Sequence, residues 1–200
     1  MVDKTQPAIE NHVSRKRPGL GILAGAVLLT GAFIVTASIA AFSDTTDNTG
    51  NTWSTGTVVL TDDDGGSGIL FTVVGMKPLD VVTNCIVVTY EGTLLPADVV
   101  LYGVSGGTGL DAYLDLIVEE GTGGIFNNCS GFSATSTVYT GGTLADFAVA
   151  HTNFGNGAGT WTPSANPESV TFKFTATLQD NNAAQGLDAT ATFTWEAQNQ

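Results

Sequence analysis

Three consecutive acidic residues, Asp62, Asp63 and Asp64, form the densest group of potential metal ligands in the chain, and two glycines follow them. Calcium loops supply oxygen ligands at alternating positions and close with a bidentate carboxylate. The run has neither that spacing nor the closing glutamate, so a solvated hairpin tip is the better interpretation. Other acidic side chains can join the run in the folded chain, and weak calcium binding therefore stays open.

The chain has two cysteines, Cys85 and Cys129. In an exported protein the default interpretation is one disulfide. In the chain-entropy model, closing the loop between the two cysteines stabilises the folded protein by roughly 4 kcal/mol. The alternative is a two-cysteine metal site. Zinc needs three or four His, Cys or carboxylate ligands, and His151 is the only histidine after residue 41. We expect a Cys85–Cys129 disulfide and no metal site.

His151 is also the only imidazole base that a nucleophilic Ser or Cys could use after residue 41. The stretch Gly103–Gly107 (GVSGG) is interpreted as turn material and not as a nucleophile elbow, and no His-Glu-x-x-His motif occurs. His151 lies on the apolar side of a predicted helix, which indicates a packed structural role. Two acidic residues could still meet as a glycosidase pair, an alternative that the sequence leaves open. The tryptophans Trp53, Trp161 and Trp195 are better explained as core or edge residues than as a sugar-binding cleft. We expect no catalytic residues, no cofactor and no enzymatic activity.

Residues 1–41 have the order of a secretory signal peptide. A polar n-region (1–18) ends in basic residues, an uncharged apolar h-region (19–35) follows, and Ser38 and Ala40 stand at the −3 and −1 positions of a cleavage site. The alternative is a retained membrane anchor, since about 20 apolar residues span a bilayer. Four glycines in the run favour cleavage, near residues 40–42. In either case the rest of the chain is expected outside the cell.

The charge balance changes sharply once the leader is removed. Four of the six Lys and Arg residues lie in the leader, so only Lys77 and Lys173 remain in the mature chain. Seventeen of the nineteen Asp and Glu residues lie in the mature chain, beginning with Asp44. The mature chain therefore carries about −15 and repels nucleic acids and anionic lipid headgroups. We expect no nucleic-acid partner, and contact with a membrane only through an uncleaved leader.

Short runs of alternating apolar residues, separated by Gly, Asp and Asn, predict an antiparallel β-sandwich in residues 53–200. One helix is expected after Thr143 as N-cap, with Leu144, Phe147, Ala148 and His151 at helical spacing and Asp146 in its first turn. Residues 42–52 have no apolar periodicity and are expected to be extended. The expected strands are 53–60, 69–74, 81–90, 99–104, 110–118, 170–178 and 189–196.

Several motifs resemble the TasA/CalY (camelysin) family of secreted matrix-fibre proteins. They are, in order along the chain, Ala40–Asp44 (AAFSD), Trp53–Leu60 (WSTGTVVL), Met76–Asp80 (MKPLD), Leu95–Tyr102 (LPADVVLY) and Leu178–Gln198 as closing strand. Together they bracket nearly the whole mature chain. Leu79 stands where the family has a turn glycine. A type I turn is therefore expected there, without the positive φ of a type II turn.

The resemblance implies a jelly-roll-like sandwich, cleavage by a SipW-type signal peptidase closer to Ala41-Phe42, and a place in the extracellular matrix or on the cell surface of a Gram-positive, actinobacterial bacterium. In fibre-forming members the freed N-terminal segment pairs with the sheet of the next subunit. Here that segment is 42–52, and Phe42, Ser43, Asp44 and Trp53 are the residues that the resemblance assigns to assembly. The partner is then a second copy of the chain, in a head-to-tail polymer.

Two other functions remain open at this point. A monomeric binding module or adhesin would use the Gly-rich stretches between Gly103 and Gly109 or between Gly155 and Ser164. A secreted hydrolase is the third reading, because camelysins have carried a metallopeptidase label. One histidine and two cysteines that are expected to form a disulfide are too few ligands for zinc, which argues against metallopeptidase activity.

Overall fold

The computed structural model describes residues 54–66 and 68–200, and residues 56–200 form one compact unit. Several predictions concern residues outside the described ones. They are the helix expected for the signal peptide, the cleavage residues Ser38, Ala40, Ala41 and Phe42, and the donor residues Ser43, Asp44 and Trp53. In the part that is described, no helix has the length and apolar character needed to cross a bilayer.

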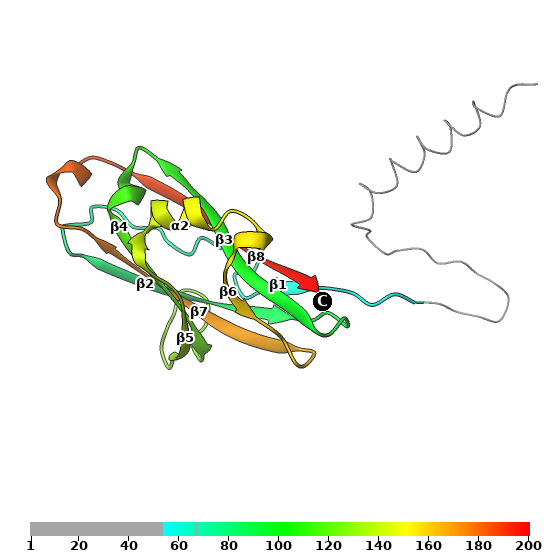
Figure 1. The fold of residues 1–200 in the computed structure, drawn as a ribbon. Helices are drawn as coiled ribbons and strands as arrows, with labels where there is room; N and C mark the ends of the chain where they lie inside the picture. Colours follow the sequence, from blue (N-terminus) through cyan, green and yellow to red (C-terminus); the bar gives the residue numbers. More distant parts are fainter. Residues whose placement is uncertain (1–53, 67) are drawn as a thin grey trace, which may run out of the picture. The chain divides into compact units, whose positions relative to one another are not determined.

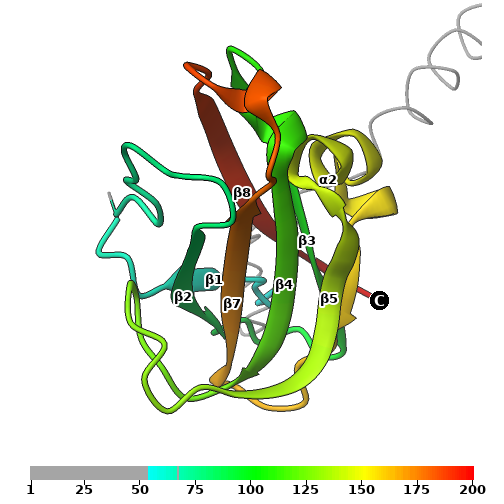
Figure 2. The same cartoon turned by 90° about the vertical axis from the view of Figure 1, so that its left-hand side faces the viewer.

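Two antiparallel sheets pack face to face, which confirms the predicted all-β sandwich. The first sheet has the order β1-β2-β7-β4-β5 and the second the order β6-β3-β8 (Figure 1). Figure 2 shows β2, β7, β4 and β5 side by side, with β3 and β8 in a layer behind them. The strand bounds are Leu60–Asp62 (β1), Val81–Tyr90 (β2), Ala97–Gly107 (β3), Leu114–Thr122 (β4), Ser133–Thr143 (β5), Ala158–Trp161 (β6), Glu168–Leu178 (β7) and Ala189–Asn199 (β8).

Aromatic side chains from β7 and β8 form the centre of the core. Phe174 packs against Phe193 with ring centroids 4.5 Å apart, and Phe172 lies 5.3 Å from Trp195. Side chains alternate between the two faces of a strand, so Phe172 and Phe174 point to the same side, as the sequence predicts. Such pairs contribute about 1 kcal/mol each beyond the area that they bury.

The predicted helix is confirmed as α2, Leu144–Ala150, the only α-helix of the described residues. Its Thr143 Oγ1 accepts from the Asp146 N–H, and the Asp146 carboxylate accepts from the Thr143 N–H at 2.9 Å. This reciprocal capping box satisfies two donors that the helix itself leaves free. The hydrogen bonds from Thr143 lower the pKa of Asp146. Phe147, fully buried, anchors α2 in the core.

Two of the predicted strands are wrong in whole or in large part. In 69–74 no residue is in a strand. Leu70 and Phe71 are adjacent yet both pack against the core, which an extended strand with alternating sides does not allow. In 53–60 only Leu60 belongs to a strand among the described residues. Before it, the Thr57 carbonyl oxygen accepts from the N–H groups of both Thr93 and Leu94 in place of a regular ladder.

The predicted strand 110–118 begins four residues late. Leu110–Tyr113 forms a 3-10 helix, and β4 starts at Leu114. Leu110 and Tyr113 both pack against the core, and residues three apart lie on the same side of a 3-10 helix. Sequence reasoning also missed β5 and β6, which connect through α2 and the short 3-10 helix Phe154–Asn156.

The turn before β2 contradicts the prediction made for Leu79. Its φ is +68°, and the Asp80 N–H donates to the Lys77 carbonyl oxygen at 3.0 Å. Pro78 at the second position, a positive φ at the third and this hydrogen bond define a type II turn. The Asp80 carboxylate accepts from the Lys77 N–H at 2.7 Å, and the Leu79 N–H donates to the Leu178 carbonyl oxygen. These bonds hold Leu79 in a conformation that its own side chain disfavours.

Candidate functional site

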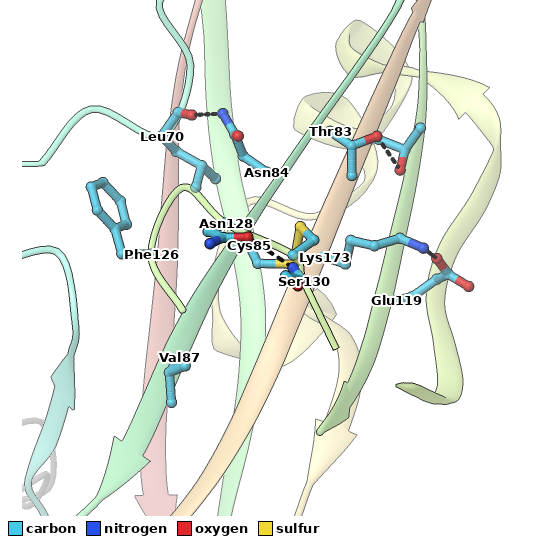
Figure 3. The surroundings of a disulfide bond; sticks show 12 residues. Leu70, Thr83, Asn84, Cys85, Val87, Glu119, Phe126, Asn128, Ser130 and Lys173 are labelled. Carbon is cyan, nitrogen blue, oxygen red and sulfur yellow. Dashed lines mark hydrogen bonds and ion pairs between the residues drawn. A yellow bond between two sulfur atoms is a disulfide. The ribbon is translucent and has the colours of Figure 1, made fainter. Parts of the chain in front are cut away.

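The disulfide joins Cys85 in the middle of β2 to Cys129 in the loop between β4 and β5, as predicted (Figure 3). The Cα atoms lie 5.2 Å apart, and Cys85 is fully buried. Near it the Asn127 N–H donates to the Cys85 carbonyl oxygen at 2.9 Å. The disulfide therefore fixes this loop against the outer side of β2.

Lys173 lies on β7 beside this loop (Figure 3). Its Nζ is 2.5 Å from the Glu119 carboxylate on β4 and 5.0 Å from the centre of the Phe132 ring. Glu119 and Lys173 are direct cross-strand partners, and opposite charges in this position stabilise a sheet by a few tenths of a kcal/mol to about 1 kcal/mol. The contact connects β4, β7 and the loop that holds Cys129.

The acidic run Asp62–Asp64 begins at the last residue of β1, and its carboxylates accept hydrogen bonds from the protein's own backbone. Asp63 accepts from the Val87 N–H at 2.8 Å and from the Phe126 N–H at 2.7 Å. Asp62 accepts from the Asp64 N–H, and Asp64 accepts from the Gly66 N–H. Burial raises the pKa of Asp62, and the Asp64 and Asp63 carboxylates raise it further. Across residues 54–66 and 68–200 no three His, Cys, Asp or Glu side chains are arranged to hold a metal ion.

His151 has the packed position expected for it, but at the C-cap of α2 and not within the helix. Its ring lies 5.1 Å from that of Phe147 and 5.7 Å from that of Tyr139, and its Nδ1 is 2.7 Å from the Asn156 carbonyl oxygen. These contacts connect α2 to the chain that leads into β6.

The two glycine-rich stretches considered for ligand binding are partly built into the sheets. Residues up to Gly107 of the first stretch belong to β3, and β6 occupies four residues of the second. Glu168, the first residue of β7, holds the segment between β6 and β7 in place by hydrogen bonds. Its carboxylate accepts from Trp161 Nε1 at 3.0 Å, from the Ser164 N–H and Oγ at 2.8 and 2.9 Å, and from the Ala165 N–H at 3.0 Å. The Trp161 hydrogen bond and then those from Ser164 and Ala165 lower the pKa of Glu168, although burial opposes the shift.

The open edges of the two sheets are the remaining candidates for a binding surface. Edge strands present unpaired N–H and C=O groups, and proteins protect them by shortness, bulges, prolines or charged side chains. Three of the four edge strands have such protection. β1 has three residues, β6 has four with a register shift against β3, and β5 pairs with β4 through three register shifts.

The fourth edge strand, β8, lacks these features. Its eleven residues pair with β3 without a register shift, from Ala97 opposite Asn199 to Gly107 opposite Ala189. It contains no proline, lysine or arginine. Glu196 is its only charged residue, and the carboxylate of Glu196 accepts from Tyr102 Oη at 2.9 Å and from Gln198 Nε2 at 2.8 Å. β8 is therefore the long and regular edge of the sandwich, and β1 lies close to part of it.

The sequence predicted β8 as a strand but carried no signal that it would be an edge. Strand order depends on pairings between residues far apart in the chain, such as Ala97 with Asn199. The absence of proline and lysine from 189–199 was visible, and this is the one feature that could have pointed to the site.

Comparison with known proteins gives no identity for the chain. The sequence matches no model of a known protein family, and a search of curated proteins finds no match either. The resemblance to the TasA/CalY family therefore rests on the sequence motifs alone.

Proposed function

We propose that the protein is a secreted structural subunit that assembles into fibres in the extracellular matrix or on the cell surface. Subunits join head to tail when residues 42–52 of one copy, freed by a signal peptidase, add as a strand to a sheet of the next copy. Strand addition of this kind obtains affinity from main-chain hydrogen bonds and needs an open edge. A contact between two different surfaces propagates as a filament when it does not close into a ring.

The observation that carries this proposal is the regular eleven-residue edge of β8. A soluble monomer with such an edge risks uncontrolled pairing, and the other three edges of this sandwich are short or bulged. The net charge is consistent with a contact between subunits that forms only by specific pairing. A mature chain with a net charge of about −15 stays dispersed until such a pairing overcomes the repulsion between subunits.

Deleting the donor segment tests this function. Residues 42–200 are expected to form filaments under the electron microscope and large species in light scattering, whereas residues 53–200 stay monomeric at the same concentration. The far-ultraviolet circular dichroism of the two proteins should agree, which controls for folding. Two equally monomeric proteins at millimolar concentration would refute the proposed function.

A further inference from the structure

The outer face of the first sheet carries a continuous group of apolar and methyl-bearing side chains. Side chains alternate along a strand, and Cys85 reaches the loop on the outer side of β2, so Val81 and Thr83 point outward too. Thr83 lies opposite Thr175 of β7, with the two hydroxyl oxygens 3.3 Å apart, and Thr175 lies opposite Ile117 of β4. We call these neighbouring positions the outer patch, and its members are Val81, Thr83, Ile117, Thr175 and Thr177.

The outer patch is open to solvent in the part of the chain that the structure describes. Val81 and Ile117 are both exposed, and Figure 2 shows α2 beside β5, away from β2 and β7. Two more exposed apolar residues flank the patch, Leu79 next to the start of β2 and Ile125 in the loop that Cys129 anchors. Antiparallel sheets that face water usually carry polar side chains on that side. Contiguous exposed apolar side chains, in contrast, mark interaction surfaces.

This face is also nearly neutral, although the chain is strongly acidic. The outward positions of β2, β7, β4 and β5 carry three charged side chains, Asp115, Glu119 and Lys173. Lys173 pairs with Glu119, and Asp115 accepts from Gln179 Nε2 at 2.6 Å. One net negative charge therefore remains on the face, whereas the mature chain carries about −15. A cationic partner would bind the acidic surface elsewhere, so the outer patch suits a partner of the same charge, which a second copy is.

We propose that the outer patch packs against the same patch of a second copy, related by a two-fold axis. A two-fold contact uses one self-complementary surface on both copies, and sheet faces pack about 10 Å apart with interdigitating side chains. The threonine methyl groups and the side chains of Val81 and Ile117 supply the apolar surface. Because both faces are nearly neutral, the repulsion between the two net charges is smallest in this orientation.

The size of the outer patch determines the strength of the contact. Three neighbouring strands and about six residues along each cover about 15 Å by 20 Å, at roughly 4.8 Å between strands and 3.3 Å per residue. Two such faces bury roughly 600 Å², about half of what a stable interface needs. Single copies therefore associate only at millimolar concentration. Along two filaments the contact repeats and its effect multiplies, so neighbouring filaments pack side by side. This effect on filaments rests on the proposed function, and the contact between single copies does not.

Methyl signals in nuclear magnetic resonance spectra test the contact between single copies. The protein is residues 53–200, which include the whole compact unit. From micromolar to millimolar concentration the Val81 and Ile117 signals are expected to shift together, with half of the change in the millimolar range. Val104, exposed on β3 of the second sheet, should keep its signals unchanged. Val81 and Ile117 signals that do not shift refute the proposal. Equal shifts at Val104 mean that the patch meets a different surface of the second copy, and they overturn the two-fold contact.

A negative charge in the outer patch is the matching perturbation. Val81→Glu places two added carboxylates in one two-fold contact, and the 58% exposure of Val81 lets the chain fold around the new side chain. Val104→Glu is the matched control, because Val104 is a strand valine with 62% exposure on the other sheet. We expect Val81→Glu to raise the concentration at half change roughly tenfold or more, and Val104→Glu to leave it as in wild type. Two folded variants that behave alike contradict the proposal. If Val81→Glu does not fold, the concentration series of wild type decides alone.

Filaments of residues 42–200 give a second readout in the electron microscope. Wild type and Val104→Glu should form lateral bundles, whereas Val81→Glu should form single filaments of the same length. Wild-type filaments that stay single overturn the lateral contact. If wild type forms no filaments, the proposed function fails, and the methyl signals still decide whether the patch binds a second copy. Patch signals that differ between dilute 42–200 and 53–200 would show that the chain's own residues 42–52 cover the patch, which also overturns the proposal.

Discussion

Replacing Glu168 by glutamine tests whether one carboxylate holds the chain between β6 and β7. In Glu168→Gln only one of the two terminal atoms remains an acceptor. The amide is expected to keep its oxygen toward Ser164 and Ala165, which supply three of the four donors. Its NH₂ group then faces Trp161 Nε1–H, donor against donor, and Trp161 is only 7% exposed.

The expected loss of stability follows from these contacts. An unsatisfied buried donor costs about 1–3 kcal/mol, and hydrogen bonds to a charged acceptor are stronger than those to a neutral one. Because Glu168 is itself partly exposed, we take a value near the middle, about 2 kcal/mol at pH 7. Urea unfolding measures it as a lower midpoint with an unchanged slope.

The pH dependence has a definite sign. The pKa of Glu168 is lower in the folded protein than in the unfolded chain, where a glutamate titrates near about 4.3. Its contribution is therefore fully present above the unfolded pKa and is lost as the pH falls through the folded pKa. The stability difference between wild type and Glu168→Gln should hold from pH 7 to about 5 and shrink below pH 4.

Glu91→Gln is the matched control, because Glu91 is exposed and its carboxylate accepts no hydrogen bond within the described residues. It should change stability by less than about 0.5 kcal/mol. The reasoning fails if Glu168→Gln behaves like this control at pH 7, or if its deficit does not diminish in acid.

Two further variants test the turn and the disulfide. Leu79→Gly should stabilise the protein by up to about 1 kcal/mol in urea unfolding, because relief of the positive φ exceeds the entropy that glycine adds to the unfolded chain. The Leu79 side chain is 65% exposed and contributes little packing. A loss of stability in this variant would contradict the prediction. The double variant Cys85→Ser/Cys129→Ser should lose roughly 4 kcal/mol, and the Asn127 amide, bonded to Cys85 in the native loop, should exchange faster. An Asn127 amide that stays protected would show that the loop does not depend on the disulfide.

Elements with apolar residues on one side were predictable from sequence, because burial of that side is enough to determine them. β2 was predicted as 81–90 and is observed with the same bounds. α2 was predicted from Thr143 and Asp146, since its capping box depends only on residues three apart. The disulfide followed from having two cysteines.

Elements decided by distant contacts were not predictable. β5 contains mostly Ser, Thr and Gly with only Val138 and Tyr139 as large apolar residues, so it has no apolar pattern and forms because β4 offers it a ladder. The 69–74 segment has the opposite character, with strong β propensity but no partner strand. The positive φ of Leu79 results from hydrogen bonds to Leu178 and within the turn. The candidate site at β8 could not be predicted for the same reason, because only the order of the strands makes β8 an edge.

The contact of Lys173 with Glu119 and Phe132 has a practical consequence for following assembly. Lys77 is the other amine of the described residues, and it is exposed, with no side-chain hydrogen bond or ion pair among them. Acylating reagents react with accessible amines, so they should label Lys77 before Lys173, whose side chain is 26% exposed and paired with Glu119. A dye attached at Lys77 would sit in the turn before β2, outside β8, and would report on filament growth without occupying the edge that growth is proposed to use.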